Sequence, residues 1–399
     1  MLLTKTVRGS RLAASRATMS FSTAGAALEW GRSSAGAVSL TLNRPKALNA
    51  LDGPMCQEVK DALLRWRRDP GDRPSVFVVK GAGGKAFCAG GDVKTVWQEL
   101  QDLRSTASPS TAIGSGTRGS VHSDFFRVEY EMNYLLGTSE VPQVSLWDGI
   151  VMGGGVGISA LGKYRVATEK TLFAMPETAI GLFPDVGSSY WLPLLEPRGF
   201  GLYMGLTGAR LRAADLLNSG VATHYVTSDL IGDLECSLSA VSASTAVKDI
   251  LDGFHARSIA SIDASKSVLP KQAQRIADTF GSASGVAQVI EALQSDASDW
   301  SKETLSLISK MSPTSMLVTY EQLKRGKSRP LQECLEMEFR LMMRCMSAPD
   351  FTEGIRAVLI DKDHSPKWNP KAVSDVTQEQ CSNYFEPLPT GNELKLSDL

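Results

Sequence analysis

The chain of 399 residues lacks the features on which several classes of protein depend. Its 42 basic and 43 acidic side chains leave a net charge of −1, so no excess of positive charge favours nucleic acid as the main partner. Only four histidines are present, and none has the spacing of metal ligands, so no metal site is expected. The apolar stretch 141–160 is interrupted by Asp148 and by glycines, so we expect no membrane-spanning helix and no membrane partner.

Cysteine is also scarce and scattered. The six cysteines form no Cys-x-x-Cys pair, which argues against a zinc site and against a disulfide framework, and favours reduced thiols. Hydrophobic residues make up 43% and charged residues 21% of the chain, as in ordinary globular proteins. Its length predicts one large domain with an appendage.

Residues 1–27 differ in composition from the rest of the chain. They contain no acidic residue, one lysine, three arginines, and many serine, threonine and alanine residues. This composition is typical of an organellar transit peptide, so we predict a mitochondrial transit peptide that is removed near residues 20 to 30. The alternative is a disordered tail without a targeting role.

Residues 28–226 show an alternation of strand and helix patterns. Short apolar runs predict strands, helical spacing predicts helices between them, and glycines stand where strands end. This pattern predicts an α/β core whose loops carry the chemistry. The expected strands are 37–42, 76–80, 143–147, 164–168 and one that begins at 172, and the expected helices are 52–66 and 152–161.

Three further regions complete the expected organisation. Residues 105–123 are rich in serine, threonine and glycine, which predicts a flexible insertion, either a loop over a site or a tolerated surface loop. Residues 227–370 are expected to be helical and residues 371–399 to form a polar tail. The sequence shows no internal repeat. Amphipathic helices are expected at 258–277, 284–308, 315–325 and 331–345.

Two glycine-rich stretches, 85–93 and 152–158, are candidates for binding an oxyanion. Glycine lets backbone N–H groups approach a ligand oxygen, and a helix that begins there adds a partial positive charge. Taken alone, each stretch is weak evidence, because a cluster of glycines is more often a turn or a close packing contact.

A third stretch, 173–187, places two carboxylates in an otherwise apolar sequence. Glu177 and Asp185 lie among prolines and glycines. Burial raises the pKa of a carboxyl group, which suits acid–base or nucleophilic chemistry. The alternative is that either acid caps a helix or a turn.

These stretches belong to a set of motifs that runs from about residue 29 to residue 370, and in these motifs the chain resembles the crotonase (enoyl-CoA hydratase/isomerase) superfamily. The last motifs are specific to its 3-hydroxyisobutyryl-CoA hydrolase branch. The motifs occupy residues 42–51, 86–92, 153–155, 175–187, 206–211, 312–315, 350–363 and 366–368.

The resemblance implies a spiral core of repeated ββα units with a helical C-terminal part. Coenzyme A, as part of an acyl-CoA substrate, would lie across the core, and no separate cofactor is implied. The thioester carbonyl would enter an oxyanion hole made by the backbone N–H groups of Ala89 and Gly154. Gly90, Gly91 and Gly153 would shape the two loops.

The resemblance also assigns roles to three acids. Glu177 matches the catalytic glutamate, Asp185 the second acid of the hydrolases, and Glu129 a substrate-binding glutamate. The alternative for Glu129 is a solvated carboxylate on a helix.

Two departures from the hydratases point to the reaction. Hydratases carry a glutamate where this chain has Gly157, and a glycine where it has Asp185. The resemblance therefore implies hydrolysis of 3-hydroxyisobutyryl-CoA in valine breakdown, in the mitochondrial matrix. It also implies that the helical C-terminal part covers the site and mediates homo-oligomers. Hydrolysis of another short acyl-CoA, or a structural role in the mitochondrial ribosome, are the alternatives.

Overall fold

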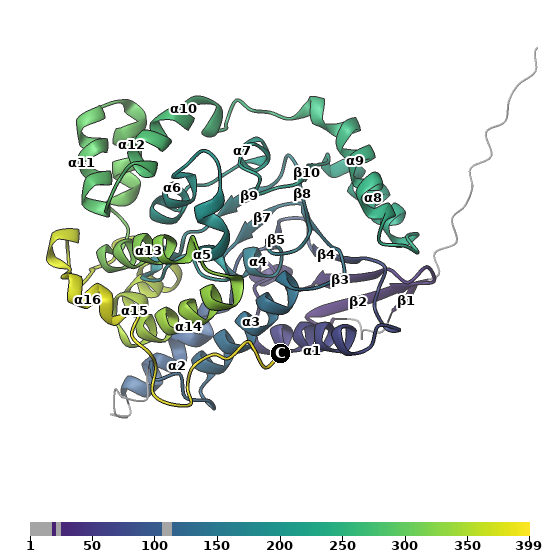
Figure 1. The fold of residues 1–399 in the computed structure, drawn as a ribbon, viewed down its shortest axis with the longest axis horizontal. Helices are drawn as coiled ribbons and strands as arrows, with labels where there is room; N and C mark the ends of the chain where they lie inside the picture. The colour runs from purple at the N-terminus through teal and green to yellow at the C-terminus, as the bar shows by residue number, and fades with distance from the viewer. Residues whose placement is uncertain (1–17, 21–24, 106–113) are drawn as a thin grey trace, which may run out of the picture.

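The computed structural model describes residues 18–20, 25–105 and 114–399 (Figure 1). Most of the expected transit peptide, and residues 106–113 of the expected insertion, lie outside the described residues. The first described strand, β1 (Thr18–Ser20), pairs antiparallel with β2 (Leu28–Ser33).

Two sheets share the strands of the described chain. The larger sheet has the order β1-β2-β3-β4-β6-β8-β10, and the smaller has the order β5-β7-β9. All pairs from β3 onward are parallel. The remaining strands are β3 (Val38–Leu42), β4 (Phe77–Gly81), β5 (Ala86–Cys88), β6 (Gln143–Trp147), β7 (Ile150–Met152), β8 (Tyr164–Ala167), β9 (Leu172–Ala174) and β10 (His224–Tyr225).

The chain follows the same path three times. From β4, β6 and β8 in turn, it leaves the large sheet, adds one short strand to the small sheet, and then enters a helix. This is the spiral of ββα units that the resemblance implies, and that prediction is confirmed. The repeat is not visible in the sequence because each strand of the small sheet has only three residues.

Helix α1 (Gly53–Arg68) shows how local sequence sets an element. The side chain of Asp52 accepts a hydrogen bond from the N–H of Met55 and so caps the first turn. Met55, Val59 and Leu63 follow at helical spacing and are buried. This face packs against α3 (Val121–Gly137).

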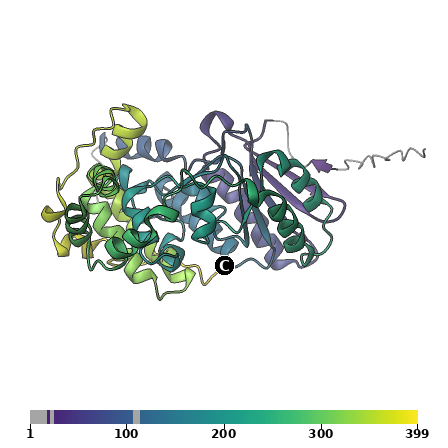
Figure 2. The same cartoon turned by 90° about the horizontal axis from the view of Figure 1, so that it is seen from above.

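The other helices divide between the core and the C-terminal region. In the core, α2 to α7 and the 3-10 helix η2 (Glu177–Ile180) follow the strands. Viewed from above, the large sheet with α8 and α9 lies at one end of the molecule, and the helices from α10 onward gather at the other (Figure 2). The remaining bounds are α2 (Val93–Ser105), α4 (Gly154–Gly157), α5 (Ser188–Trp191), α6 (Phe200–Thr207), α7 (Ala213–Asn218), α8 (Ile231–Ser239), α9 (Ala246–Ser258), α10 (Leu269–Ile276), α11 (Val286–Asp296), α12 (Asp299–Ile308), α13 (Pro313–Gly326), α14 (Leu331–Ser347), α15 (Pro349–Ile355) and α16 (Gln378–Asn383).

Three expected helices are interrupted. The expected helix 258–277 contains a turn in which Asp263 accepts the N–H of Ser265, and α10 begins only after it. The expected helix 284–308 is divided at Ala297, which has a left-handed φ of 51°. The expected helix 152–161 is a single helical turn, α4, because glycine favours the helical conformation weakly.

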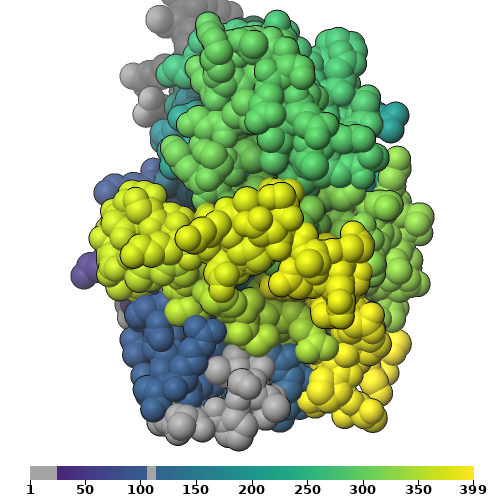
Figure 3. Space-filling view, turned by 90° about the vertical axis from the view of Figure 1, so that its left-hand side faces the viewer, coloured from purple at the N-terminus to yellow at the C-terminus, as the bar shows by residue number. Residues whose placement is uncertain are grey.

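The prediction of a polar tail over 371–399 is wrong. Phe385, Leu388, Leu394 and Leu396 are buried, and α16 begins with a capping box. Figure 3 shows the C-terminal residues, in yellow, lying across the green helices of the C-terminal region. The four apolar side chains are too widely spaced to form a pattern, so only the packed structure reveals their role.

The expected insertion over 105–123 also ends earlier than predicted. Helix α3 begins at Val121, and His122 and Ser123 are buried. The carboxylate of Glu99 on α2 accepts hydrogen bonds from the N–H groups of Val121 and His122, which supplies the cap that the local sequence does not provide.

Helix α15 packs so closely on η2 that there is no space for side chains between them. A Cβ added to Gly354 would lie 2.4 Å from the carbonyl carbon of Ile180. We expect Gly354→Ala to lower the free energy of unfolding by roughly 1–3 kcal/mol, because overpacking displaces backbone. The matched control is Gly253→Ala in α9, where nothing lies within 4 Å. Alanine should stabilise that helix by about 0.5–1 kcal/mol. Urea unfolding measures both, and stabilisation by Gly354→Ala would contradict the packing.

Candidate active site

The three acids singled out in the sequence meet at the centre of the molecule. Glu129 lies on α3, Glu177 is the first residue of η2, and Asp185 lies in the loop between η2 and α5. Their exposed fractions are 2%, 5% and 6%. The alternative that Glu129 is a solvated helix carboxylate is therefore wrong, since its side chain is inside the protein.

The turn between β7 and α4 lies directly against two of these acids. A Cβ added to Gly153 would lie 3.2 Å from Oε1 of Glu177, and one added to Gly154 would lie 2.6 Å from Oε1 of Glu129. The added Gly154 Cβ would also lie 3.0 Å from the backbone nitrogen of Gly91. Glycine is required here because the backbone must approach both the acids and the neighbouring loop.

The structure corrects one of the two expected oxyanion donors. The N–H of Ala89 donates a hydrogen bond to the carbonyl of Leu48, with a nitrogen–oxygen distance of 3.0 Å. That N–H is therefore engaged within the protein. The N–H groups of Gly91 and Gly154 have no acceptor among the described residues, and their loops are in contact. Gly91 replaces Ala89 as the candidate partner of Gly154.

Two carboxylate oxygens at the site have no hydrogen-bond partner in the described structure. They are Oε1 of Glu129 and Oε2 of Glu177. A buried oxygen without a partner costs free energy, so such atoms mark places where a ligand or water supplies the missing bond.

Asp185 has a partner that the sequence did not reveal. The hydroxyl of Tyr130 donates to Oδ2 of Asp185 over 2.7 Å, and both groups are buried. Tyr130 follows Glu129 directly on α3. This helix therefore brings Glu129 to the turn at Gly154 and Tyr130 to Asp185. The only signal in the sequence was this adjacency, which does not distinguish a site residue from a core tyrosine.

Burial raises the pKa of all three acids. For Glu129 and Glu177 the pKa lies well above the ordinary value, first because of burial and then because of repulsion from Asp185. Burial raises the pKa of Asp185 to about 6, although the hydrogen bond from Tyr130 lowers it. Each of the three carboxyl groups is therefore harder to ionise than an exposed one.

The position of the second hydratase glutamate is closed in this structure. A Cβ added to Gly157 would lie 2.7 Å from Cβ of Val186 and 3.0 Å from Nδ2 of Asn133. A glutamate side chain has no room there without displacing both neighbours. Val186 follows Asp185 directly, so the loop that supplies the new acid also fills the place of the missing one.

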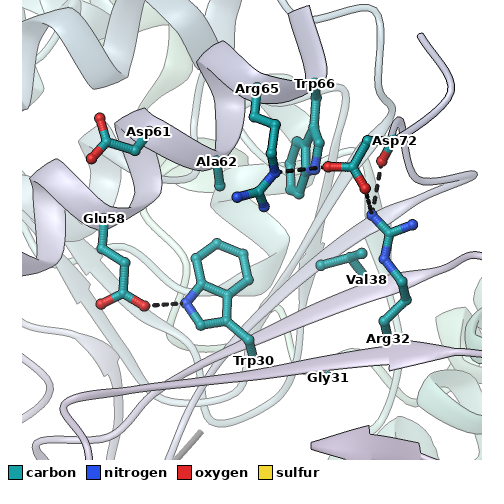
Figure 4. A pocket seen from close by; sticks show the side chains of 10 residues that line it. All are labelled: Trp30, Gly31, Arg32, Val38, Glu58, Asp61, Ala62, Arg65, Trp66 and Asp72. Atoms are coloured by element: carbon teal, nitrogen blue, oxygen red, sulfur yellow. Dashed lines mark hydrogen bonds and ion pairs between the residues drawn. The ribbon is translucent and has the colours of Figure 1, made fainter. Parts of the chain in front are cut away.

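A separate cavity of about 770 Å³ lies between α1 and strands β2 and β3 (Figure 4). Several of its polar groups bind one another: Arg32 and Arg65 both bind Asp72, and Trp30 donates to Glu58. None of the three site acids lines it. We therefore place the candidate active site at the buried acids.

Two features are absent from the part of the chain that the structure describes. No group of three or more histidine, cysteine, aspartate or glutamate side chains there could hold a metal ion. No helix among those residues is long and apolar enough to cross a membrane.

Comparison with known proteins gives the family. A model of the enoyl-CoA hydratase/isomerase family matches residues 37–385. The chain belongs to this family. The mitochondrial 3-hydroxyisobutyryl-CoA hydrolase of Xenopus tropicalis is 47% identical over 90% of this chain and 88% of its own length. The enzyme of that name from Homo sapiens is 45% identical over 88% of this chain and 86% of its own.

Solved structures share the fold. A carnitinyl-CoA dehydratase from Mycobacterium thermoresistibile superposes with a TM-score of 0.79 at 33% identity, covering 93% of this chain and 98% of its own. An enoyl-CoA hydratase from Rhodobacter sphaeroides 2.4.1 gives 0.77 at 33% identity, covering 93% of this chain and 100% of its own. The predicted family and fold class are confirmed.

The raised pKa of Asp185 has a consequence for stability. A carboxyl group whose pKa rises from 3.8 to about 6 on folding stabilises the protein while it is protonated. That contribution is complete below pH 3.8 and is lost as pH rises through about 6. We expect the wild type to lose up to about 3 kcal/mol over this range relative to Asp185→Asn. Urea unfolding at several pH values measures it, and parallel curves for the two proteins would contradict the burial of this charge.

Proposed function

We propose that this protein hydrolyses the thioester of 3-hydroxyisobutyryl-CoA to 3-hydroxyisobutyrate and free CoA. The observation that carries the proposal is the exchange of acids at the site. Asp185 is buried beside Glu177, and the space beside Gly157 is filled by Val186 and Asn133. Hydration of a double bond by two glutamates therefore lacks one of them, although the two solved relatives are named as a dehydratase and a hydratase.

The relatives of higher identity support the same reaction. Those named 3-hydroxyisobutyryl-CoA hydrolase match at 41–47% identity across about nine-tenths of the chain. Their names also say mitochondrial, which supports import by the basic segment 1–27. We extend this to the mitochondrial matrix and to valine breakdown as the setting of the reaction.

The oxyanion hole in this proposal is formed by the N–H groups of Gly91 and Gly154. Attack on a thioester carbonyl places negative charge on its oxygen, and preorganised N–H donors stabilise that charge as it develops. Loss of one such donor costs on the order of 3 kcal/mol in other enzymes. The partial positive charge at the start of a helix adds little here, because α4 is one turn long.

Glu177 supplies the reactive carboxylate. It acts by one of two routes: direct attack on the carbonyl carbon, or removal of a proton from the attacking water. In both routes the C–S bond breaks, and the CoA thiolate leaves and takes up a proton. In the route of direct attack, water then hydrolyses the mixed anhydride between Glu177 and the acyl group, which releases the acid and restores the carboxylate. Both routes need Glu177 ionised, and its raised pKa makes the ionised carboxylate a stronger base and nucleophile.

Asp185 and Glu129 contribute polar oxygens around the acyl group. Asp185, held by Tyr130, is suited to accept a hydrogen bond from the 3-hydroxyl of the substrate. Oε1 of Glu129, which has no partner in the described protein, offers a second acceptor next to Gly154. A substrate with a hydroxyl near the thioester satisfies acceptors that a plain acyl chain leaves unpaired.

Glu177→Gln tests the reactive group. The variant keeps size and one hydrogen-bonding oxygen but cannot become negatively charged, so we expect kcat to fall by about three orders of magnitude or more. Binding of CoA thioesters, measured by calorimetry, should change little because the nucleotide and pantetheine portions of CoA offer far more groups for binding than the thioester does. Near-normal thiol release by Glu177→Gln would overturn the assignment of Glu177.

Asp185→Asn tests the substrate hydroxyl. We expect kcat/KM for 3-hydroxyisobutyryl-CoA to fall more than kcat/KM for isobutyryl-CoA, by a factor of roughly 5 to 150, since an unpaired buried polar group costs about 1–3 kcal/mol. Thiol release with both substrates gives the ratio. An equal fall in kcat/KM for the two substrates would mean that Asp185 acts on the attacking water or on Glu177, and not on the substrate hydroxyl.

A further inference from the structure

The turn that carries Asp185 has an unfavourable backbone conformation. Val186, the next residue, has a φ of 54°, in the left-handed region that a β-branched side chain rarely adopts. Such a conformation persists only when surrounding groups hold it. Val186 also packs over Gly157, so the conformation of this turn decides both where Asp185 lies and what fills the empty hydratase position.

Two buried polar side chains from the C-terminal helices hold this turn from both sides of Asp185. Before it, Nε2 of Gln322 on α13 donates to the carbonyl of Pro184 over 2.7 Å. After it, the carboxylate of Glu338 on α14 accepts the N–H groups of Gly187 and Ser189, over 2.7 and 2.9 Å. Its Oε1 also accepts the hydroxyl of Ser189.

Neither side chain is well explained by stability alone. Both are completely buried, and Oε1 of Gln322 has no partner in the described structure. Burial raises the pKa of Glu338 to about 8, although the hydrogen bonds from Ser189 and Gly187 lower it. A buried polar or ionisable side chain is weak support for stability, since apolar residues of the same volume often serve as well. These two side chains restrict the conformation of the turn, because their hydrogen bonds form only when the turn has this conformation.

We propose that Glu338 and Gln322 are positioning residues that hold the turn 184–189 so that the Asp185 carboxylate meets Tyr130 and faces the substrate. The proposal rests on the function proposed above and deepens it. According to this proposal, the helical C-terminal region helps to determine which acyl group the enzyme accepts. A displacement of about 1 Å in a reacting or orienting group is enough to cost on the order of 10²-fold in rate.

Glu338→Gln is the first variant. An amide can accept hydrogen bonds with only one of its two ends, so its NH₂ group would face an N–H of Gly187 or Ser189. We expect kcat for 3-hydroxyisobutyryl-CoA to fall about 10- to 100-fold while KM changes by less than about threefold. The loss for isobutyryl-CoA should be several-fold smaller, because that substrate has no 3-hydroxyl.

The decisive measurement combines this variant with Asp185→Asn. If Glu338 acts through Asp185, Glu338→Gln should change kcat less than about twofold once Asp185 has been replaced, because residues that act as one unit are not additive. An equal loss of rate in both backgrounds would mean that Glu338 supports only the fold, and would overturn the proposal. Gln322→Met, which removes the bond to Pro184, should follow the same pattern.

Asp215→Asn is the matched control. Asp215 is also completely buried, and its Oδ1 accepts the N–H groups of Val268 and Leu269 over 2.8 and 2.9 Å. These bonds fix the start of α10, which carries none of the candidate site residues. Its replacement should lower the melting temperature without changing the ratio of the two substrates. A change in that ratio as large as that of Glu338→Gln would count against a specific role for Glu338.

Two further measurements keep the proposal testable. If Glu338→Gln does not fold, Ser189→Ala removes one of its bonds more mildly and enters the same cycle. If the wild type releases no thiol from any short acyl-CoA, the proposed function fails, and a crystal structure of Glu338→Gln or Ser189→Ala decides the positioning alone. We expect Val186 to leave the left-handed region and the bond between Tyr130 and Asp185 to be lost. An unchanged turn would overturn the proposal.

Discussion

The contact between two glycine turns is the constraint on which the site depends. The turn at 153–155 lies against the loop 88–91 so closely that a Cβ on Gly155 would be 2.2 Å from the carbonyl of Cys88. This approach places the N–H groups of Gly91 and Gly154, which have no acceptor among the described residues, side by side, and it brings Glu129 and Glu177 against the same backbone. The ββα spiral makes the contact possible, because β5 and β7 are parallel neighbours in the small sheet and end at the same edge.

The core supplies the acids, and the C-terminal helices hold them in place. Ser312 on the N-terminal cap of α13 donates its N–H to the carbonyl of Thr178, and α15 packs directly on η2. Gln322 and Glu338 do the same for the turn of Asp185. Chain segments more than 130 residues apart therefore define the relative position of Glu177 and Asp185. A core cut off after residue 226 would keep every candidate site residue and lose the contacts that orient two of them.

Local signals in the sequence predict the α/β class of the fold and the importance of Glu177 and Asp185: apolar strands, glycines at strand ends, and carboxylates in apolar surroundings. Glu129 and the spiral of ββα units are predicted only by the resemblance to the family. The sequence does not predict the interactions between segments that are far apart along the chain. The resemblance points to Ala89 as a donor, and the motif does not reveal that the carbonyl of Leu48 already accepts the Ala89 N–H. Tyr130, Gln322 and Glu338 went unnoticed because each resembles an ordinary helix residue until its partner is seen. The sequence after residue 370 predicts a polar tail because its buried apolar side chains do not follow the spacing of a helix or a strand.

The presence of Asp185, and of Gly157 where hydratases carry a glutamate, changes the packing of the site as well as its chemistry. Asp185 and Val186 are neighbours, so a turn that directs the carboxylate toward Tyr130 also drives the valine over Gly157. Restoring a glutamate at position 157 would therefore not restore hydratase chemistry while this turn keeps its conformation, because Val186 and Asn133 occupy the space that the side chain needs. The reverse change, glycine in place of Asp185, would remove the acid but leave Val186 in place. The two reactions are separated by the conformation of the whole turn, which Gln322 and Glu338 hold, and so by more than the identity of any one residue in it.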